Sequence, residues 1–119
     1  MYNLYLDDYR IPTDGINWTI VRSYNAFVKI ITEKGLPELV SYDHDLSPEH
    51  YNIGHVRSFT KEDYDNVKEK TGLHCAEWLI KYCQENKLKI PNWKTHSLNL
   101  IGQENINEVL LKAKEAECL

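Results

Sequence analysis

Short apolar segments alternate with longer segments of helical periodicity along this chain, and this alternation restricts the possible folds more than any other feature. Four segments have the length and composition of strands: Leu4–Leu6, Trp18–Val21, Leu39–Tyr42 and Trp93–Ser97. Three segments have apolar side chains at helical spacing: Ser23–Gly35, Thr71–Asn86 and Gly102–Ala113. This order predicts an α/β fold in which helices cover both faces of a mainly parallel sheet, as in a three-layer sandwich.

The connection between the first two predicted strands, residues 7–17, is short. A parallel crossover with a full helix and its turns needs about a dozen residues or more. Pro12 and Gly15 also give this connection the composition of a turn. We therefore expect a shortened, irregular first crossover where an ordinary doubly wound fold has a helix.

Residues 47–70 form a polar segment that contains Pro48, Gly54 and a dense run of charges. Connections of this length in a small domain are more often functional than idle. We interpret 47–70 as a long loop or lid, with a short helix near Lys61–Lys68. The chain as a whole, 1–119, has the length of a single domain.

Composition excludes some classes of function. The net charge of −4 and the lack of a basic run argue against a protein that coats nucleic acid. The sequence has no signal-peptide pattern and no segment that is apolar enough to span a membrane, so we expect a cytoplasmic protein. The cysteines Cys75, Cys83 and Cys118 lack metal-site spacing and favour reduced core thiols, with zinc binding or a disulfide as the alternatives.

Acidic side chains follow two of the predicted strands. Asp7 and Asp8 follow the first strand, and Asp43 and Asp45 follow the third. Parallel strands end at one edge of a sheet, where ligands bind, and neighbouring strands lie about 5 Å apart. Carboxylates this close favour a bound cation, and Mg²⁺ prefers oxygen ligands and often bridges to phosphate. We expect Asp7, Asp8 and Asp43 to bind Mg²⁺ or another divalent cation; the alternative is that the first two acids cap a loop.

The fourth predicted strand also ends in polar residues, His96 and Ser97, followed by Asn99. Histidine titrates near neutral pH and can move protons, although a lone His96 would more often be a satisfied core residue. Ser97 and Asn99 can hydrogen-bond phosphate oxygens, and Arg10 can pair with a phosphate bidentately. The backbone amides at Gly102, where we expect the last helix to start, would add anion binding.

His44 lies between two of these acids, so its side chain is expected on the face of the strand opposite to theirs. This position makes His44 a weaker candidate than His96 for proton transfer. Three further histidines, in the lid or at a helix start, are expected to be solvated: His50, His55 and His74.

Four motifs occur in an order that resembles a known family. They are Leu6-Asp7-Asp8-Tyr9-Arg10, Asp43-His44-Asp45-Leu46, Thr71-Gly72 and His96-Ser97-Leu98-Asn99. The first resembles the first strand of response-regulator receiver domains, where a pair of acids binds magnesium. Asp43 falls where receivers carry the phospho-accepting aspartate. Together, over nearly the whole chain, the motifs resemble the cyclic-phosphate-processing receiver domain family.

This resemblance implies a flavodoxin-like fold and a phosphoesterase that acts on a small cyclic phosphate, such as a nucleotide or an ADP-ribose derivative. The enzyme would be a metal-dependent hydrolase. His96, His44 and Asp45 are then the candidate catalytic residues, with His96 favoured for proton transfer and Asp45 for orienting the substrate. Arg10, Ser97, Asn99 and Gly102 are the candidate substrate-binding residues.

Two other functions stay open on the sequence alone. A receiver module for signalling would be phosphorylated on Asp43. Ordinary receivers carry a lysine at the end of their last strand, whereas this region has His96 and Ser97, and Lys94 comes two residues too early. A binding protein, in contrast, would retain a nucleotide without hydrolysing it.

Overall fold

The computed structural model describes residues 2–56 and 58–117 and has the predicted α/β class. The strands are β1 (Asn3–Leu6), β2 (Trp18–Val21), β3 (Leu39–Tyr42) and β4 (Asn92–Thr95). They form one parallel sheet in the order β2-β1-β3-β4. The carboxyl ends of β1, β3 and β4, which carry the candidate site residues, are therefore neighbours at one edge of the sheet.

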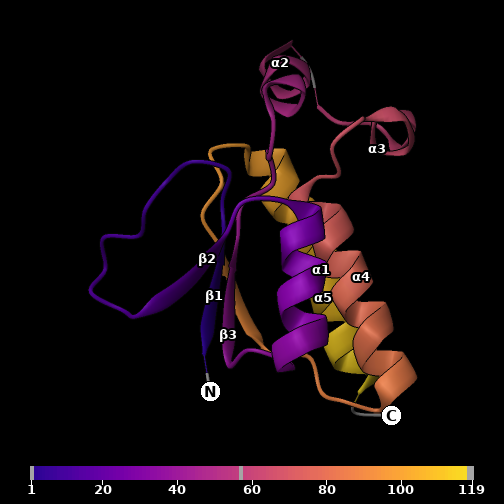
Figure 1. Cartoon of the computed structure of the whole chain (residues 1–119). Helices are drawn as coiled ribbons and strands as arrows, with labels where there is room; N and C mark the ends of the chain where they lie inside the picture. Colours follow the sequence, from indigo (N-terminus) through magenta and orange to yellow (C-terminus); the bar gives the residue numbers. More distant parts are fainter. Residues whose placement is uncertain (1, 57, 118–119) are drawn as a thin grey trace.

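The three long helices are α1 (Tyr24–Lys34), α4 (Gly72–Asn86) and α5 (Leu100–Ala116). Their apolar side chains share one core with Leu4 and Leu6 of β1 and with their partners in β3, Val40 and Tyr42. Figure 1 shows all three helices on the same side of the strands. The expectation of helices on both faces is therefore corrected, because the long helices within the described residues form one layer.

The shortened first crossover explains the missing helical layer. As predicted, residues 7–17 contain no helix. Asp14 in this crossover accepts a hydrogen bond from the Trp18 indole at 2.9 Å and lies 3.4 Å from Lys94 Nζ. Trp18 packs edge-on against Tyr5, with ring centroids 5.6 Å apart. Side chains and this crossover, rather than a helix, cover that face of the sheet.

Side-chain caps set the starts of several helices, among them α1 and α5. Ser23, the first residue of the predicted helical segment, caps α1, because its Oγ accepts a hydrogen bond from the Ala26 N–H at 3.2 Å. Asn99 caps α5, because its Oδ1 accepts from the Gly102 N–H at 2.9 Å. The last helix therefore begins at Leu100, two residues before the predicted start.

Segment 47–70 contains two short helices, α2 (Pro48–Val56) and α3 (Lys61–Asn66). The helix near Lys61 is predicted, whereas α2 is not, because it contains Gly54 and has no clear apolar stripe. Figure 1 shows both helices beyond the carboxyl ends of the strands, separate from the layer of long helices. The segment thus lies over the edge of the sheet at which the acidic strand ends meet.

Two further sequence expectations concern the cysteines and the membrane. Cys75 and Cys83 are buried and reduced, as predicted, while Cys118 lies outside the described residues. Within the described ranges, no helix combines the length and the apolar content needed to cross a bilayer.

Candidate functional site

Three side chains converge where β1, β3 and β4 end. The register pairs Tyr5 with Ser41 and Ser41 with Lys94, so the residues two positions further along each strand share a face. These residues are Asp7, Asp43 and His96. One ligand atom of each lies within 4.8 Å of the others, which makes this the converging group of potential metal ligands within the described residues. We call it the Asp–His cluster.

Asp7 is fully buried and its carboxylate accepts hydrogen bonds at both oxygens. Oδ1 accepts from the backbone N–H groups of Tyr9 at 3.0 Å and Arg10 at 2.9 Å. Oδ2 accepts from Arg10 Nη1 at 3.3 Å and His96 Nε2 at 2.9 Å. Burial would raise the pKa of Asp7, but these hydrogen bonds and the Arg10 charge outweigh it and hold the pKa below its ordinary value. Asp7 is therefore an anion at neutral pH.

Asp43 lacks this support. It is 1% exposed, and its Oδ2 has no hydrogen-bond partner among the described residues. Burial, and after it the charge of Asp7, raises the pKa of Asp43 to about 7, although Arg10 and a hydrogen bond with Ser97 oppose the rise. A buried carboxylate oxygen without a partner, beside an ionised carboxylate, is an arrangement that a cation would stabilise.

His96 is held between Asp7 and Ser41. Since an ionised carboxylate only accepts, His96 Nε2 donates to Asp7, and the neutral ring then accepts at Nδ1 from the Ser41 hydroxyl at 2.7 Å. Burial lowers the pKa of His96 in spite of the opposing effect of Asp7, so the ring is neutral at pH 7. Both ring nitrogens are engaged in this state, and His96 serves to orient Asp7.

Asp8 is not part of the cluster, although the sequence predicts it as a metal ligand. Its Oδ1 accepts a hydrogen bond from the Tyr51 hydroxyl at 2.9 Å. Burial raises the pKa of Asp8, the hydrogen bond from Tyr51 lowers it, and the charge of Asp7 raises it, with a net increase. In this arrangement Asp8 connects the end of β1 to α2.

The Asp–His cluster could hold a divalent cation. The two carboxylates are suitable donors for Mg²⁺, and together with an imidazole they suit several transition metals. Asp43 Oδ2 is open to a new ligand, whereas Asp7 Oδ2 is already contacted by Arg10 and His96. A cation bound to Asp7 would therefore displace at least one of these two donors.

A pocket of about 760 Å³ opens beside the cluster, which is a typical size for a small-molecule site. It is lined by the ends of β1 and β3, by α2 and by the β4–α5 connection, through Tyr9, Arg10, Asp45, Tyr51, Asn52, Gly54, Leu98 and Asn99. Three of the predicted site residues are on this wall: Arg10, Asp45 and Asn99.

Arg10 connects the pocket to the cluster. Its Nη1 lies 3.3 Å from Asp7 Oδ2 and 3.3 Å from the His96 carbonyl oxygen, while the side chain is 22% exposed. Arg22 fixes the turn that carries it, because Arg22 Nη1 donates to the Arg10 carbonyl oxygen at 2.6 Å. The Arg10 guanidinium is thus placed between the Asp7 carboxylate and any anion in the pocket.

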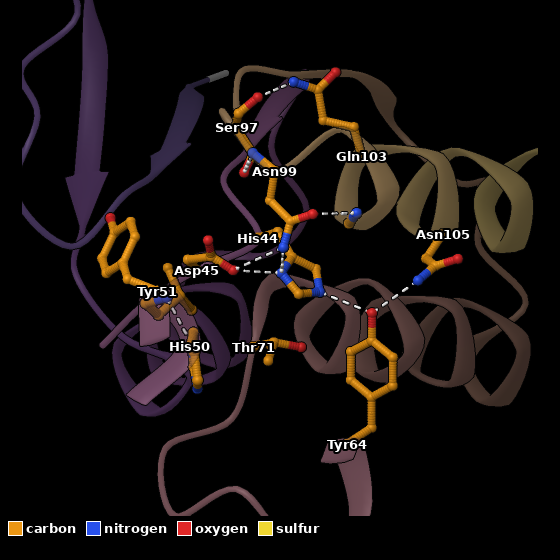
Figure 2. Close-up of polar contacts among 12 residues, drawn as sticks. His44, Asp45, His50, Tyr51, Tyr64, Thr71, Ser97, Asn99, Gln103 and Asn105 are labelled. Atoms are coloured by element: carbon orange, nitrogen blue, oxygen red, sulfur yellow. Dashed lines mark hydrogen bonds and ion pairs between the residues drawn. The ribbon is translucent and has the colours of Figure 1, made fainter. Parts of the chain in front are cut away.

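His44 and Asp45 belong to a second polar group, drawn in Figure 2. His44 Nδ1 lies 2.7 Å from Asp45 Oδ1, and His44 Nε2 lies 2.8 Å from the Tyr64 hydroxyl. Asn99 Nδ2 also donates to Asp45 Oδ1, at 3.3 Å. His44 is fully buried and packs on Gly102, so its side chain does point away from the Asp–His cluster, as expected. Asp45 lines the pocket, whereas His44 lies behind it.

Ser97 and Gly102 do not have the roles that the sequence predicts. Ser97 is buried, where its Oγ accepts from the Asn99 N–H at 3.1 Å and its side chain hydrogen-bonds Asp43. It therefore contacts the Asp–His cluster and does not line the pocket. The Gly102 N–H donates to Asn99, so this amide is not available to an anion. Glycine is needed there because a Cβ would overlap the His44 ring.

The expectation that the remaining histidines are solvated is wrong for His50 and His74. His50 is fully buried, accepts from the Leu46 N–H at 2.7 Å and donates to the Glu69 carbonyl oxygen at 2.5 Å. His74 is partly buried and donates to a carbonyl oxygen of α3. Burial lowers the pKa of both, so they act as neutral connectors between loops. The side chain of His55 lies outside the described part of the chain.

Several residues of the site were not predicted from the sequence: Ser41, Tyr51, Tyr64 and Asn105. Ser41 offered a signal, because it is the polar residue in an otherwise apolar strand. Tyr51 and Tyr64 lie on α2 and α3, whose positions over the sheet edge depend on tertiary contacts. Their spacing in the sequence carries no sign of those contacts.

The model of a family described as the cyclic-phosphate processing receiver domain matches residues 2–112 of the chain. Comparisons with curated proteins and with solved structures give no match. The matched range contains every side chain of the Asp–His cluster, the pocket wall and the group around His44.

Proposed function

Since the chain belongs to the cyclic-phosphate processing receiver domain family, we propose that it hydrolyses a small cyclic phosphate in the pocket beside the Asp–His cluster. The observation that carries this proposal is that Arg10 and Asp45 line the same pocket of about 760 Å³. A guanidinium to bind phosphate and a carboxylate to accept a proton from water are groups that phosphodiester hydrolysis can use.

Arg10 would bind the phosphate. Its planar guanidinium can donate two parallel hydrogen bonds to phosphate oxygens. Tyr9, Tyr51 and Leu98 give the pocket apolar area for the rest of the ligand, and Asn99 adds a polar group. A net charge of −4 disfavours a polyanion such as a nucleic acid, which supports a small ligand with a single phosphate group.

Asp45 would accept the proton of the attacking water. Its Oδ1 accepts from Asn99 and contacts His44, and Figure 2 shows Oδ2 without a partner among the residues drawn. The geometry supports Asp45 in this role better than His96, which the sequence favours. Asp45 lines the pocket, while both ring nitrogens of His96 are engaged.

The hydrolysis would open the phosphate ring. The water oxygen forms a new bond to phosphorus as one ring P–O bond breaks, and the product is a phosphomonoester with one free hydroxyl. The proton that Asp45 removes from water is returned to the departing oxygen. Arg10 stabilises the charge on the phosphate oxygens while these bonds change.

Asp7 and Asp43 would hold the divalent cation, with His96 beside them. When bound, such a cation supplies positive charge for the phosphate and lowers the pKa of a water molecule. The buried Asp43 Oδ2, which has no partner among the described residues, supports this assignment.

The test is turnover of a panel of cyclic phosphates, including 2′,3′-cyclic nucleotides, by purified protein with Mg²⁺ or with a chelator. We expect phosphomonoester product that depends on the cation. Asp45→Asn should lower kcat by about 10²–10⁴, the usual contribution of a general base. Asp14→Asn, the same change in the first crossover away from the pocket, should keep full activity. No turnover of any panel member by the wild-type protein would reject the proposal.

Binding of a panel member without turnover, measured by calorimetry, would instead support a protein that retains its ligand. The alternative of a phospho-accepting receiver gains no support from Lys94, the nearest lysine in sequence to the strand end. Its Nζ pairs with Asp14 in the first crossover, at 3.4 Å.

A further inference from the structure

A chain of hydrogen bonds links α5 and α3 to the carboxylate on the pocket wall. Figure 2 shows its members in order: Asn105 on α5, Tyr64 on α3, then His44 and Asp45. Asn105 Nδ2 lies 2.9 Å from the Tyr64 hydroxyl oxygen, which lies 2.8 Å from His44 Nε2. His44 Nδ1 lies 2.7 Å from Asp45 Oδ1. All three distances are within the range of hydrogen bonds.

The direction of this chain follows from its first donor. An amide NH₂ group can only donate, so the Tyr64 oxygen accepts from Asn105 and the Tyr64 proton is left for His44. Burial raises the pKa of Tyr64 to about 12, so the hydroxyl keeps this proton at neutral pH. The hydroxyl can give this proton to His44 Nε2. At the other ring nitrogen the Asp45 carboxylate accepts at 2.7 Å and is closer than the Asn99 amide at 3.4 Å, so the contacts at both nitrogens favour a ring with its proton on Nδ1.

Packing leaves the His44 ring little freedom to turn. A Cβ on Gly102 would overlap the ring, which shows how closely α5 approaches it. Phe59 meets the ring edge-on, with centroids 4.8 Å apart, and His44 is fully buried. The donor at Nε2, Tyr64, and the acceptor at Nδ1, Asp45, therefore select the tautomer of a ring that is already fixed in place.

We propose that Tyr64 and Asn105 are positioning residues, which hold His44 as the Nδ1–H tautomer so that it fixes Asp45 with Oδ2 turned to the pocket. The role of Asp45 as proton acceptor rests on the proposed function, whereas the tautomer and the hydrogen-bond chain do not. Docking of α3 completes the chain, because Tyr64 is the member that this helix contributes. Residues that touch no ligand thereby determine the geometry of one that does.

The direct test is nitrogen-15 NMR of the histidine rings in the full-length protein. In the wild-type protein, His44 should have a protonated Nδ1 and an Nε2 with the chemical shift of a lone-pair nitrogen. Tyr64→Phe removes the hydroxyl proton and should give a mixture of tautomers. Asn105→Asp supplies an acceptor in place of a donor, draws the Tyr64 proton away from the ring and should place a proton on Nε2.

Control variants separate this role from a general loss of packing. Tyr82→Phe deletes a hydroxyl on α4, and Asn92→Asp makes the isosteric change at an exposed position; both should leave the His44 signals as in wild type. An unchanged tautomer in both Tyr64→Phe and Asn105→Asp would overturn the proposal.

Kinetics supply the second measurement. If the protein hydrolyses a panel member, Tyr64→Phe should lower kcat by roughly tenfold, less than the loss of the base itself, with KM almost unchanged. A change in KM alone would contradict a positioning role. If the wild-type protein shows no turnover but the tautomer shifts as expected, the proposed function fails and the positioning of Asp45 stands.

Discussion

Asp7 Oδ2 is the atom for which the Arg10 guanidinium and a cation in the Asp–His cluster would compete. It accepts from Arg10 Nη1 and from His96 Nε2, and a cation bound to Asp7 would approach the same oxygen. Arg10 also lines the pocket. A cation should therefore release the guanidinium toward a phosphate, so that the two ligands assist each other.

Replacing Arg10 should change the affinities for Mg²⁺ and for phosphate in opposite directions. Arg10→Met should tighten Mg²⁺ binding by roughly tenfold, because a nearby positive charge and a competing donor are removed. The same change should weaken binding of inorganic phosphate by about ten- to a hundredfold, the worth of a charged hydrogen bond. Calorimetric titrations with each ligand alone measure both effects. Arg10→Lys, which keeps the charge, should weaken phosphate binding and leave Mg²⁺ binding nearly unchanged; weaker binding of both ligands by Arg10→Met would contradict the competition.

The raised pKa of Asp43 predicts how the stability of the protein depends on pH. Its pKa rises from 3.8 in the unfolded chain to about 7 in the folded protein. Between these values the unfolded chain has lost a proton that the folded protein keeps, so the free energy of unfolding falls as pH rises to about 7 and then levels off. Asp43→Asn should remove this fall, which is on the order of 4 kcal/mol because the rise spans about three pKa units and each unit corresponds to about 1.4 kcal/mol.

Denaturant unfolding of both proteins at several pH values between 4 and 8, without divalent cations, measures this difference. Asp14→Asn is the matched control: the hydrogen bond from Trp18 lowers the pKa of Asp14, so Asp14 contributes no fall in this pH range and the variant should keep the fall seen in wild type. Saturating Mg²⁺ should stabilise the wild-type protein and not Asp43→Asn. A parallel pH dependence of wild type and Asp43→Asn would show that Asp43 titrates normally.

At the scale of elements, the site depends on how closely the starts of the helices approach the ends of the strands. Glycines allow this close approach. A Cβ on Gly72, the first residue of α4, would overlap the Asp43 carbonyl oxygen, and one on Gly102 of α5 would overlap the His44 ring. Gly54 of α2 has more room, because its nearest neighbour is the flexible Asn99 side chain at 3.0 Å.

These three glycines give a graded prediction for alanine substitution. Gly72→Ala should destabilise the fold by about 2–3 kcal/mol, because overpacking against backbone has no side chain to move. Gly102→Ala should cost less and disturb the His44 signals in NMR, because a ring can shift. Gly54→Ala should be neutral or stabilising by up to about 1 kcal/mol through helix propensity. Thermal unfolding of the three variants tests the order, and an equal loss at Gly72 and Gly54 would contradict it.

The elements that sequence predicts well are those whose local signals agree with their environment. β1 and β3 are apolar runs that end in acids, and Ser23 caps α1 as its position suggests. The layer count was wrong because no local signal tells on which face a helix packs. α2 was missed because contacts such as that between Tyr51 and Asp8, rather than an apolar stripe, hold it in place.

The same division applies to the site. Asp7, Asp43 and His96 could be predicted together because strand order and register bring strand ends to one edge. The separation of Asp8 from them depends on the direction of one side chain toward α2. The tautomer of His44 depends on Tyr64, which is distant in sequence and outside any motif. Residues that act through tertiary hydrogen bonds belong to no periodic pattern or motif from which they could be predicted.

At the scale of the whole molecule, segment 47–70 meets the sheet and the long helices through the ring contacts of Phe59 and Tyr64 with His44 and through a few buried polar contacts. His50 is one of them, because it joins the Leu46 N–H to the Glu69 carbonyl oxygen, residues that flank the two short helices. Among the described side chains of the two short helices, Tyr64 is the one that packs against the main core. Such a segment should open at lower free energy than the sheet and the long helices.

Hydrogen exchange of wild-type protein and His50→Leu tests whether segment 47–70 opens independently of the sheet and the long helices. Leucine keeps much of the apolar volume of His50 but leaves a buried donor and acceptor unpaired, which costs about 1–3 kcal/mol each. We expect amides of 47–70 to exchange at least tenfold faster in the variant, while amides of β1, β3 and α4 keep most of their protection. His74→Leu, which frees α3 from α4, should affect the α3 end of the segment alone. A uniform loss of protection across the sheet in His50→Leu would mean that the segment and the body unfold together.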